Sequence, residues 1–262
     1  MSETFRDFER RGWENAAATY SRSFTDVTGG TIHALLEVTR AAKGECLLDV
    51  ATGPGTVAAI AEQRGLDTVG VDCSPRMAAI ARSATSPVVG DVDALPLRTG
   101  AFDVAVCNFG VLHFAHPEKA VSEMTRSVRS GGRVAVTVWA PPSENVFFGM
   151  IYRALEKHAP RKPEIPTSTP FFHFSEEKNM KALLHAAGLR DAGVKIVTWT
   201  ATVPSAEGYV KLFLEGSVRT AAILRAQDDA ARARITESIA AELAPRADSV
   251  PVAAVVGWGV KP

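Results

Sequence analysis

The chain has 262 residues, enough for one large domain or for one domain with a lid, and 46% of them are apolar, enough for a sizeable core. Its 29 Lys and Arg residues balance 29 Asp and Glu residues, which argues against a broad electrostatic grip on nucleic acid. The charged N-terminus argues against a signal peptide, and no apolar run reaches the length of a membrane span.

The three cysteines, at positions 46, 73 and 107, show neither CxxC spacing nor an even count. We therefore expect reduced thiols in a cytoplasmic protein. No group of His and Cys residues has the spacing of metal ligands, so no metal site is expected. The sequence does not indicate an oligomeric state.

The first 45 residues are predicted to form helices, over 2–21 and 31–42, that act as a lid. Trp13 and Tyr20 lie on the apolar face of the first helix. Packing is the favoured role for Trp13, whereas Tyr20 is as well suited to closing over a ligand as to packing.

The central stretch reads as strand, tight turn and helix. Residues 46–50 form a short apolar strand, a Gly53-x-Gly55 turn follows, and a helix is expected over 56–64. Glycine lets the backbone approach a ligand closely, and the free N–H groups of the next helix point at the same place. This order predicts a site for a nucleoside-bearing ligand.

Four further strands are predicted up to Trp139, over 68–71, 87–89, 102–107 and 133–139, and the turn Gly131-Gly132 is expected to lead into the last of them. Helices are expected from Pro75, with Ser74 as N-cap, and over 117–128. Mostly apolar strands that alternate with helices are typical of a buried parallel sheet, whose ligands lie at the carboxyl ends of the strands. Polar residues stand at four such ends: Asp49, Asp72, Asp91 and Asn108.

Beyond Trp139 the pattern becomes helical, with predicted helices over 145–158, 175–187 and 205–214 and a long one to about Leu243. Strands over 194–200 and 250–260 are expected side by side and antiparallel at the sheet edge. The predicted fold is α/β, a Rossmann-like doubly wound sheet of seven strands with an antiparallel last strand and helical lid insertions. The predicted division is N-terminal lid 1–45, cofactor-binding core 46–140, substrate-side insertion 141–174, and the rest of the sheet 175–262, with a helical insertion at about 204–247.

Two ligand classes compete for the glycine turn. Gly53-x-Gly55-x-x-Ala58 also matches a dinucleotide fingerprint, and Asp72 lies where an acid would take a ribose hydroxyl. Asp49, just ahead of the turn, would repel a pyrophosphate but would suit a cationic ammonium. The sequence therefore favours a ligand with an ammonium group over NAD(P).

Ordered motifs complete the pattern: Leu47–Gly55, Val69–Met77, Gly90–Leu97, Phe102–Asn108 and Gly131–Val134. In this order they resemble class I S-adenosylmethionine-dependent methyltransferases, and within that group the small-molecule enzymes related to the ubiquinone and menaquinone methyltransferases. The resemblance covers about 46–139. It implies S-adenosylmethionine as cofactor, S-adenosylhomocysteine as product and a small-molecule substrate.

The resemblance also assigns roles to individual residues. Asp72 would accept both ribose hydroxyls and Asp91 the adenine amino group, while the methionine end and the adenine surroundings would be formed by Asp49, Ala51, Gly53, Gly55, Cys73, Met77, Val92, Asn108 and Phe109. Ala51 replaces the family's first turn glycine, and we expect the turn to survive with no positive φ needed there. Apart from the resemblance, the place of Tyr20 on the N-terminal helix would let it close over the methyl group.

Methyl transfer is an in-line displacement, in which the protein aligns the nucleophile and excludes water. An oxygen or carbon acceptor must also lose a proton, whereas an amine can react without a base. His113 is the first candidate base, although capping the next helix is equally consistent with its position; Tyr20 is the second, and His173 ranks below both.

The sequence lacks the marks of several other methyltransferases. Asn108-Phe109-Gly110-Val111 replaces the Asp/Asn-Pro-Pro-aromatic motif of nucleic-acid amino methylation, and no carboxylate pair for a catechol-type metal stands there. Aromatic residues that could line a cavity for an apolar or aromatic substrate are Phe109, Phe114, Trp139, Phe147, Phe148, Phe171, Phe172, Phe174, Tyr209 and Phe213. Two alternatives stay open: a cofactor-binding protein without transfer activity and, third, an NAD(P)-dependent oxidoreductase.

Overall fold

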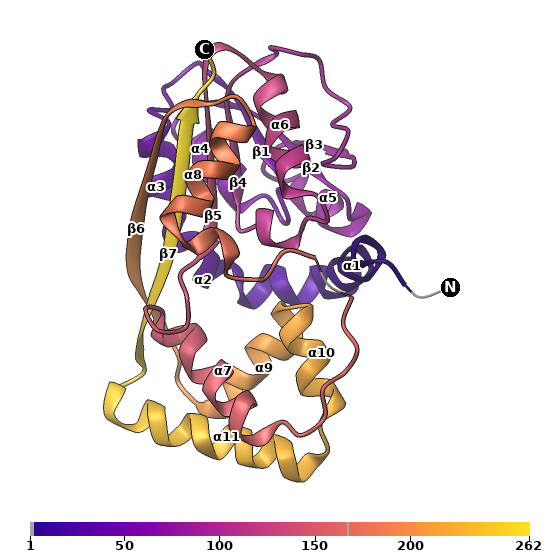
Figure 1. Ribbon diagram of the computed structural model, residues 1–262, viewed down its shortest axis with the longest axis vertical. Coiled ribbons are helices and arrows are strands. Elements are labelled where there is room, and N and C mark those ends of the chain that lie inside the picture. Colours follow the sequence, from indigo (N-terminus) through magenta and orange to yellow (C-terminus); the bar gives the residue numbers. More distant parts are fainter. Residues whose placement is uncertain (1–2, 167) are drawn as a thin grey trace.

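A computed structural model describes residues 3–166 and 168–262. Its centre is one seven-stranded sheet in the order β3-β2-β1-β4-β5-β7-β6 (Figure 1). The strands are β1 (Cys46–Val50), β2 (Asp67–Asp72), β3 (Ser86–Val89), β4 (Phe102–Asn108), β5 (Val128–Trp139), β6 (Arg190–Thr202) and β7 (Ser249–Val260). β1 to β5 pair in parallel, whereas β7 runs antiparallel to both β5 and β6. The predicted fold class and the antiparallel late pair are confirmed.

Helices cover both faces of the sheet. One face packs against α3 (Ile32–Val38) and α4 (Thr56–Gln63), through fully buried Leu36 and Leu47. The opposite face packs against α6 (Pro117–Ser127) and α8 (Glu177–Ala186), through Met124 and Leu184. Each such side chain contributes about 1.5–3 kcal/mol when it leaves water, so the apolar strands are held between the two helical layers.

A second group of helices forms a cap beyond one end of the sheet. The cap consists of α7 (Val146–His158), α9 (Ala206–Gly216), α10 (Arg219–Ala226) and α11 (Asp229–Leu243). In Figure 1 it lies below the sheet, and α1 (Phe5–Ser23) crosses between the two. Phe24, just after α1, packs edge to face on Phe147 and Phe213 of the cap, with ring centroids 6.3 and 5.7 Å apart. These aromatic contacts join the N-terminal segment to the cap.

Short helices complete the chain: α2 (Thr25–Thr28), η1 (Gly29–Thr31), α5 (Pro75–Ala81), η2 (Val111–His113), η3 (His173–Ser175) and η4 (Ala244–Arg246). The Ser74 hydroxyl accepts from the Met77 amide, with Pro75 at the first helical position, so the predicted cap of α5 is confirmed. Within the described residues, no helix is both long and apolar enough to cross a bilayer.

Several predicted boundaries are wrong. The predicted helix over 31–42 ends at Val38, because Thr39 caps it and Arg40 turns to a φ of 49°. The long helix predicted after 205–214, up to about Leu243, is two helices, α10 and α11, and the Asp228 side chain caps the second. β5 begins at Val128 rather than after the glycine pair, and the register with β4 shifts there. The predicted start of the first helix at Ser2 lies outside the described residues.

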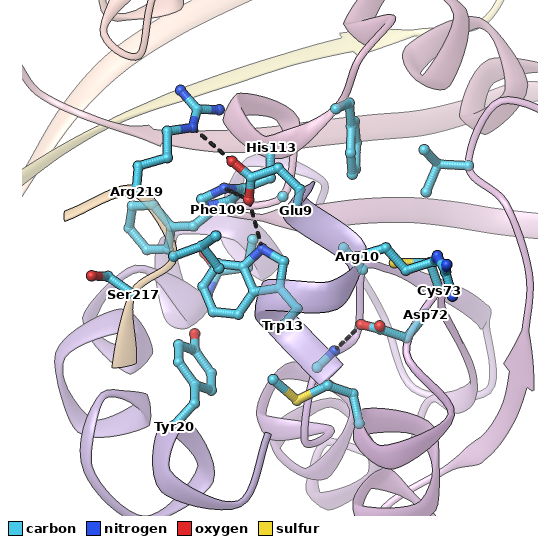
Figure 2. A pocket seen from close by; sticks show the side chains of 18 of the residues that line it. Glu9, Arg10, Trp13, Tyr20, Asp72, Cys73, Phe109, His113, Ser217 and Arg219 are labelled. Carbon is cyan, nitrogen blue, oxygen red and sulfur yellow. Dashed lines mark hydrogen bonds and ion pairs between the residues drawn. The ribbon is translucent and has the colours of Figure 1, made fainter. Parts of the chain in front are cut away.

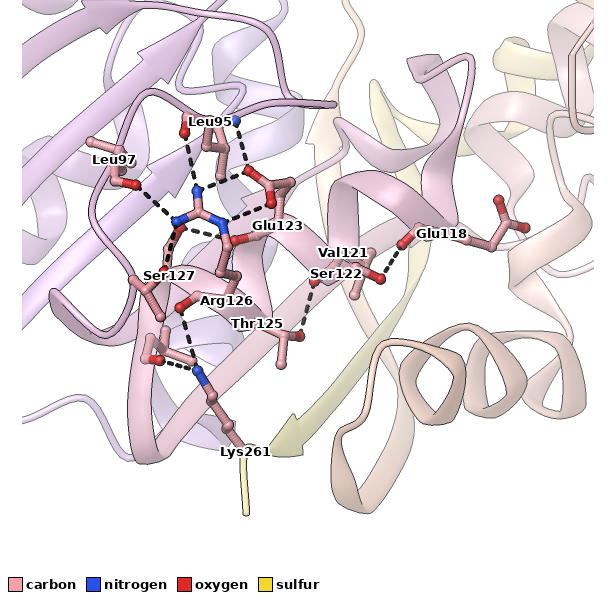
Figure 3. A network of polar contacts seen from close by, with 12 residues as sticks. Leu95, Leu97, Glu118, Val121, Ser122, Glu123, Thr125, Arg126, Ser127 and Lys261 are labelled. Atoms are coloured by element: carbon pink, nitrogen blue, oxygen red, sulfur yellow. Dashed lines mark hydrogen bonds and ion pairs between the residues drawn. The ribbon is translucent and has the colours of Figure 1, made fainter.

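A polar clamp holds the connection between β3 and β4. Arg126, near the end of α6, donates to the carbonyls of Leu95 and Leu97 and to both oxygens of Glu123 (Figure 3). Glu123 in turn accepts from the Leu95 amide at 2.9 Å. The clamp satisfies the backbone of a connection without regular structure, and it thereby fixes the segment that follows β3.

Candidate active site

A cavity of about 400 Å³ lies where the carboxyl ends of the parallel strands meet α1 and the α9–α10 turn. One part of its wall comes from the sheet, and it includes Gly53, Asp72, Cys73, Met77, Asp91 and Val92. The other part is mostly aromatic and includes Trp13, Tyr20, Phe109, Trp139, Phe148 and Phe171. Polar and aromatic side chains thus share the lining, and Figure 2 shows Asp72 on the sheet side and Glu9 and Arg219 between α1 and the cap.

The glycine turn after β1 is built from three left-handed residues. Ala51 has a φ of 55°, Gly53 of 55° and Gly55 of 87°, and the Gly55 amide donates to the Thr52 carbonyl at 2.9 Å. The turn thus survives with Ala51, as predicted, but the expectation that this position needs no positive φ is wrong. A left-handed alanine costs about 1–2 kcal/mol, which the surrounding contacts must offset.

Asp72 is fixed by backbone donors at the end of β2. One carboxylate oxygen accepts from the Gly53 amide at 2.9 Å and the other from the Ser74 amide at 2.8 Å. Burial raises the pKa of Asp72 to about 6. Each oxygen keeps a further lone pair, and the side chain lines the cavity. A pair of hydroxyl groups in the cavity would find two fixed acceptors here.

Asp49 lies beneath the glycine turn and is 1% exposed. One oxygen accepts from the Thr52 hydroxyl at 2.7 Å, whereas Oδ1 has no hydrogen-bond partner among the described residues. Burial, strengthened by the charge of Asp72, raises the pKa of Asp49 to about 7. Neither Asp49 nor Gly55, both predicted to hold the cofactor, is among the described residues that line the cavity.

The segment after β3 meets α1 across the cavity mouth. Arg6 of α1 donates to Asp91 at 2.6 Å and also to Asp93, which His116 contacts at 2.7 Å. The Asp91 carboxylate predicted to meet an adenine amino group therefore already has a partner from α1. Cys73 and Val92 line the cavity beside it, and burial raises the pKa of the Cys73 thiol to about 12, which keeps it protonated.

Asn108 has little free hydrogen-bonding capacity. Its oxygen accepts from the hydroxyls of Thr31 and Thr137, each at 2.7 Å, and its amide donates to the Thr28 carbonyl at 3.0 Å. Only one amide hydrogen is left for a ligand. Its neighbour Phe109, with a φ of 58°, stacks on Trp139 with ring centroids 3.8 Å apart. Asn108 therefore mainly stabilises the backbone around the cavity.

Tyr20 faces the cavity from α1. Its hydroxyl lies 3.2 Å from the Thr28 hydroxyl, and burial raises the pKa of Tyr20 to about 12. A phenol with that pKa remains protonated near neutral pH, which makes it a poor base. Trp13 packs edge to face against Tyr20 at 5.4 Å, but it also lines the cavity, so packing is not its only contribution.

His113, in η2, lines the cavity and does not cap α6, whose N-cap is His116. Its Nδ1 lies 3.0 Å from Glu9 Oε2, and its ring packs edge to face on Trp13 at 4.8 Å. Burial lowers the pKa of His113, against the opposing effect of Glu9. The imidazole is therefore neutral near pH 7 and able to accept a proton. His173, by contrast, is exposed and outside the residues that line the cavity.

Two residues of the site escaped the sequence analysis. Glu9 and Arg219 are 210 positions apart, and Arg219 Nε donates to Glu9 Oε1 at 2.6 Å (Figure 2). Nothing local marks either one, because both belong to ordinary charged helices. Only the buried position of Glu9, 3% exposed on a predicted lid, distinguishes it.

The predicted aromatic set divides into two groups. Cavity-lining members are Phe109, Phe114, Trp139, Phe148 and Phe171, whereas Phe147, Phe172, Phe174, Tyr209 and Phe213 pack elsewhere. Tyr209 shows why: its hydroxyl donates to the Phe147 carbonyl inside the cap. Half of the set thus belongs to the core and not to the site.

Comparison with known proteins decides the family. A model described as a methyltransferase domain matches residues 48–136. The demethylmenaquinone methyltransferase of Beutenbergia cavernae is 30% identical over 177 residues, which cover 63% of this chain and 74% of the relative. The chain belongs to the class I S-adenosylmethionine-dependent methyltransferases, related to the menaquinone methyltransferases.

Other similarities agree with this membership. The demethylmenaquinone methyltransferase of Thermus thermophilus is 39% identical over 116 residues, 41% of this chain and about half (52%) of the relative. Phosphoethanolamine N-methyltransferase 2 of Haemonchus contortus, solved with S-adenosylhomocysteine, shares the fold with a TM-score of 0.58 at 18% identity, over 100% of this chain and 61% of that one. These relatives give no support to the oxidoreductase or to the binding protein without transfer activity.

The cofactor of this methyltransferase is S-adenosylmethionine, and the site has the features that such a ligand needs. Asp72 offers two fixed acceptors for hydroxyl groups, and Asp49 Oδ1 is a buried acceptor near the turn with no partner in the described part of the chain. A cationic amine near the turn would favour the ionised form of Asp49. When bound, the cofactor supplies an activated methyl group on a sulfonium centre.

Proposed function

We propose that this methyltransferase transfers a methyl group to a small, apolar or aromatic molecule by in-line displacement. The single observation that carries the proposal is the aromatic wall opposite Asp72. The aromatic residues that line this one cavity include Trp13, Tyr20, Phe109, Trp139, Phe148 and Phe171. Such a wall favours a planar, weakly polar acceptor and disfavours a charged polymer.

The electrostatics of this wall support the same substrate class. Arg219 brings a positive charge to the cavity, but Glu9 pairs with it at 2.6 Å. The two charges neutralise each other, so neither Glu9 nor Arg219 is left as a counter-ion for a charged substrate. The related demethylmenaquinone methyltransferases suggest, by name, a quinone-type acceptor, which is also flat and apolar.

We also propose the roles of the site residues. The nucleoside would lie against Gly53, Asp72, Cys73, Met77, Asp91 and Val92, and the methionine end near Asp49, Ala51, Gly55, Asn108 and Phe109. His113 would accept the proton from an oxygen or carbon acceptor, and Tyr20 would shape the cavity near the methyl group. Residues 1–45 would act as the lid, 46–140 as the cofactor core, 141–174 as a substrate-side insertion, and 175–262 as the rest of the sheet with its helical insertion.

The test is transfer from isotope-labelled S-adenosylmethionine to a panel of phenols, hydroquinones, acidic carbon acids and amines, followed by mass spectrometry. We expect methylated phenols or hydroquinones, and a loss of roughly 10²–10⁴-fold in kcat for His113→Gln. His173→Gln, which changes an exposed histidine outside the cavity, is the matched control. Transfer to amines only, with full activity in His113→Gln, would contradict the proposal.

A further inference from the structure

Glu9 is a buried carboxylate that joins three elements. It receives hydrogen bonds from Trp13 Nε1 of its own helix at 3.1 Å and from Arg219 Nε of α10 at 2.6 Å, and it contacts His113 Nδ1 of η2 at 3.0 Å. A carboxylate with 3% exposure is stable only when donors surround it. The three partners supply those donors, as Figure 2 shows.

The charge of Glu9 determines the tautomer of His113. Burial acts to raise the pKa of Glu9, but His113 and Arg219 together hold it below its usual value, so the carboxylate is ionised. An ionised carboxylate only accepts hydrogen bonds. His113 must therefore carry its hydrogen on Nδ1, which leaves the lone pair on Nε2.

Nε2 of His113 is free to act on a ligand. It makes no hydrogen bond to the described residues, and it is not among their buried atoms without a partner. His113 lines the cavity and its Nδ1 is turned towards Glu9, so we infer that Nε2 is the ring nitrogen that a ligand in the cavity would meet. The charged groups that act on the ring are Glu9 from α1 and Arg219 from α10.

Arg219 and a close helix contact fix Glu9 in turn. The Arg219 guanidinium also donates to the Leu112 carbonyl and lies over the ring of Phe171, 5.2 Å from its centroid. On α1, Gly12 faces Val218, next to Arg219. A Cβ at Gly12 would come within 2.4 Å of Val218 Cγ1, so only glycine lets α1 approach this closely.

We propose that Glu9 is the positioning residue of His113. Because Arg219 of α10 fixes Glu9 of α1, His113 is held in the reactive tautomer and orientation only when α1 lies against α10. The inference rests on the proposed function, in which His113 is the base. Glu9 does not touch the acceptor; it fixes the tautomer and the ring orientation. The lid helix thereby becomes part of the proton-transfer machinery.

In the proposed step, the oxygen or carbon of the acceptor gives its proton to His113 Nε2 and forms a bond to the methyl group. The methyl–sulfur bond would break at the same time, and its electron pair would stay on the sulfur of S-adenosylhomocysteine. The imidazolium is stabilised by the Glu9 carboxylate, and it returns the proton to solvent after product release. No oxidant, reductant or metal is required.

The test compares Glu9→Gln with Glu3→Gln, a matched change at a carboxylate that pairs with Arg11 on the outer side of the same segment. We expect Glu9→Gln to lower kcat about 10- to 100-fold, with KM and the Kd for S-adenosylhomocysteine within about threefold. Because Glu9 raises the pKa of His113, its loss should move the ascending limb of the kcat–pH profile to lower pH. Equal losses in KM and kcat with an unmoved limb would overturn the proposal.

A second readout needs no turnover. The ¹⁵N shifts of the His113 ring report the tautomer directly, and we expect an Nδ1–H form in the wild type and a mixture of tautomers in Glu9→Gln. Unchanged shifts would overturn the role of Glu9. If His113→Gln itself stays fully active, the proposed function fails, whereas activity lost in His113→Gln but kept in Glu9→Gln overturns the present inference alone.

Gly12→Ala separates the position of the helix from its charge. The added methyl group must push α1 away from Val218, while every charged group stays in place. We expect kcat to fall, and the ascending limb of the kcat–pH profile to move to lower pH, as in Glu9→Gln. The melting temperature should stay within a few degrees of the wild-type value. A wild-type profile in Gly12→Ala would overturn the dependence on α1.

Discussion

The two halves of the cavity are built in different ways. The sheet half is assembled from residues close in sequence: the glycine turn and Asp72 are only about twenty positions apart, and Gly53 and Asp72 bond directly. The cap half depends on partners far apart, such as Glu9 and Arg219, 210 positions from each other. The first half can therefore be read from short motifs in the sequence, whereas the second half becomes visible only in the folded chain.

The largest expected effect is on the sheet half. Asp72→Ala removes the acceptors for two hydroxyl groups and leaves the amides of Gly53 and Ser74 unpaired. Hydrogen bonds to a charged group contribute about 1.5–3 kcal/mol each, so we expect the Kd for S-adenosylhomocysteine to rise about 100-fold or more. Calorimetry measures it.

Asp67→Ala is the matched control, because Asp67 is exposed at the opposite end of the same strand. We expect it to bind like the wild type. Tight binding by Asp72→Ala would show that the sheet half does not hold the nucleoside, and the contrast between the two halves would fail.

The second prediction concerns Asp49 and pH. Its pKa is about 7 in the folded protein, above the usual value near 4 in the unfolded chain, so folding disfavours its ionised form. The folded state thus binds more protons between about pH 4 and 7, and Asp49 lowers stability progressively as pH rises through that range.

Asp49→Asn should therefore gain stability relative to the wild type as pH rises from about 4 to 7, by a few kcal/mol at most, and reach a plateau above that range. Urea unfolding at several pH values measures the difference. A constant difference across this range would contradict the burial of an ionisable Asp49 beneath the turn.

The third prediction tests whether the contacts of Arg126 stabilise the connection between β3 and β4, which contributes to the sheet half of the cavity. Arg126→Ala breaks the clamp on Leu95 and Leu97, and we expect a loss of about 1–3 kcal/mol in the free energy of unfolding. Arg98→Ala, at an exposed position in the same connection, is the control. Equal stability of the two variants, measured by urea unfolding, would show that the clamp is redundant.

The smallest expected effect is at the turn itself. Ala51→Gly removes a left-handed alanine that costs about 1–2 kcal/mol, but glycine adds about 0.5–1 kcal/mol of backbone entropy cost. We expect a net gain of up to about 1 kcal/mol in stability, seen as a rise of a few degrees in the melting temperature. A clear loss of stability would mean that the packing of the Ala51 methyl group contributes more than the left-handed backbone costs.

The sequence predicted most of what depends on local order. Short-range patterns predicted the existence and order of the seven strands, the capped start of α5 and the strand-end acids, whereas β5 and β6 begin earlier than predicted. In the cap, the sequence predicted α9 as a helix of its own but joined α10 and α11, because the break between them depends on the short segment around the capping residue Asp228. The Glu9–His113–Arg219 contacts could not be predicted, because no pattern in the chain links helices so distant from one another.

The most direct test of this account is a crystal structure with S-adenosylhomocysteine and a phenolic acceptor. The account predicts ribose hydroxyls within hydrogen-bond distance of Asp72, the acceptor ring against Trp139 and Phe148, and its hydroxyl facing His113 Nε2. A ribose bound away from Asp72, or an acceptor hydroxyl on the far side of the cavity from His113, would contradict it.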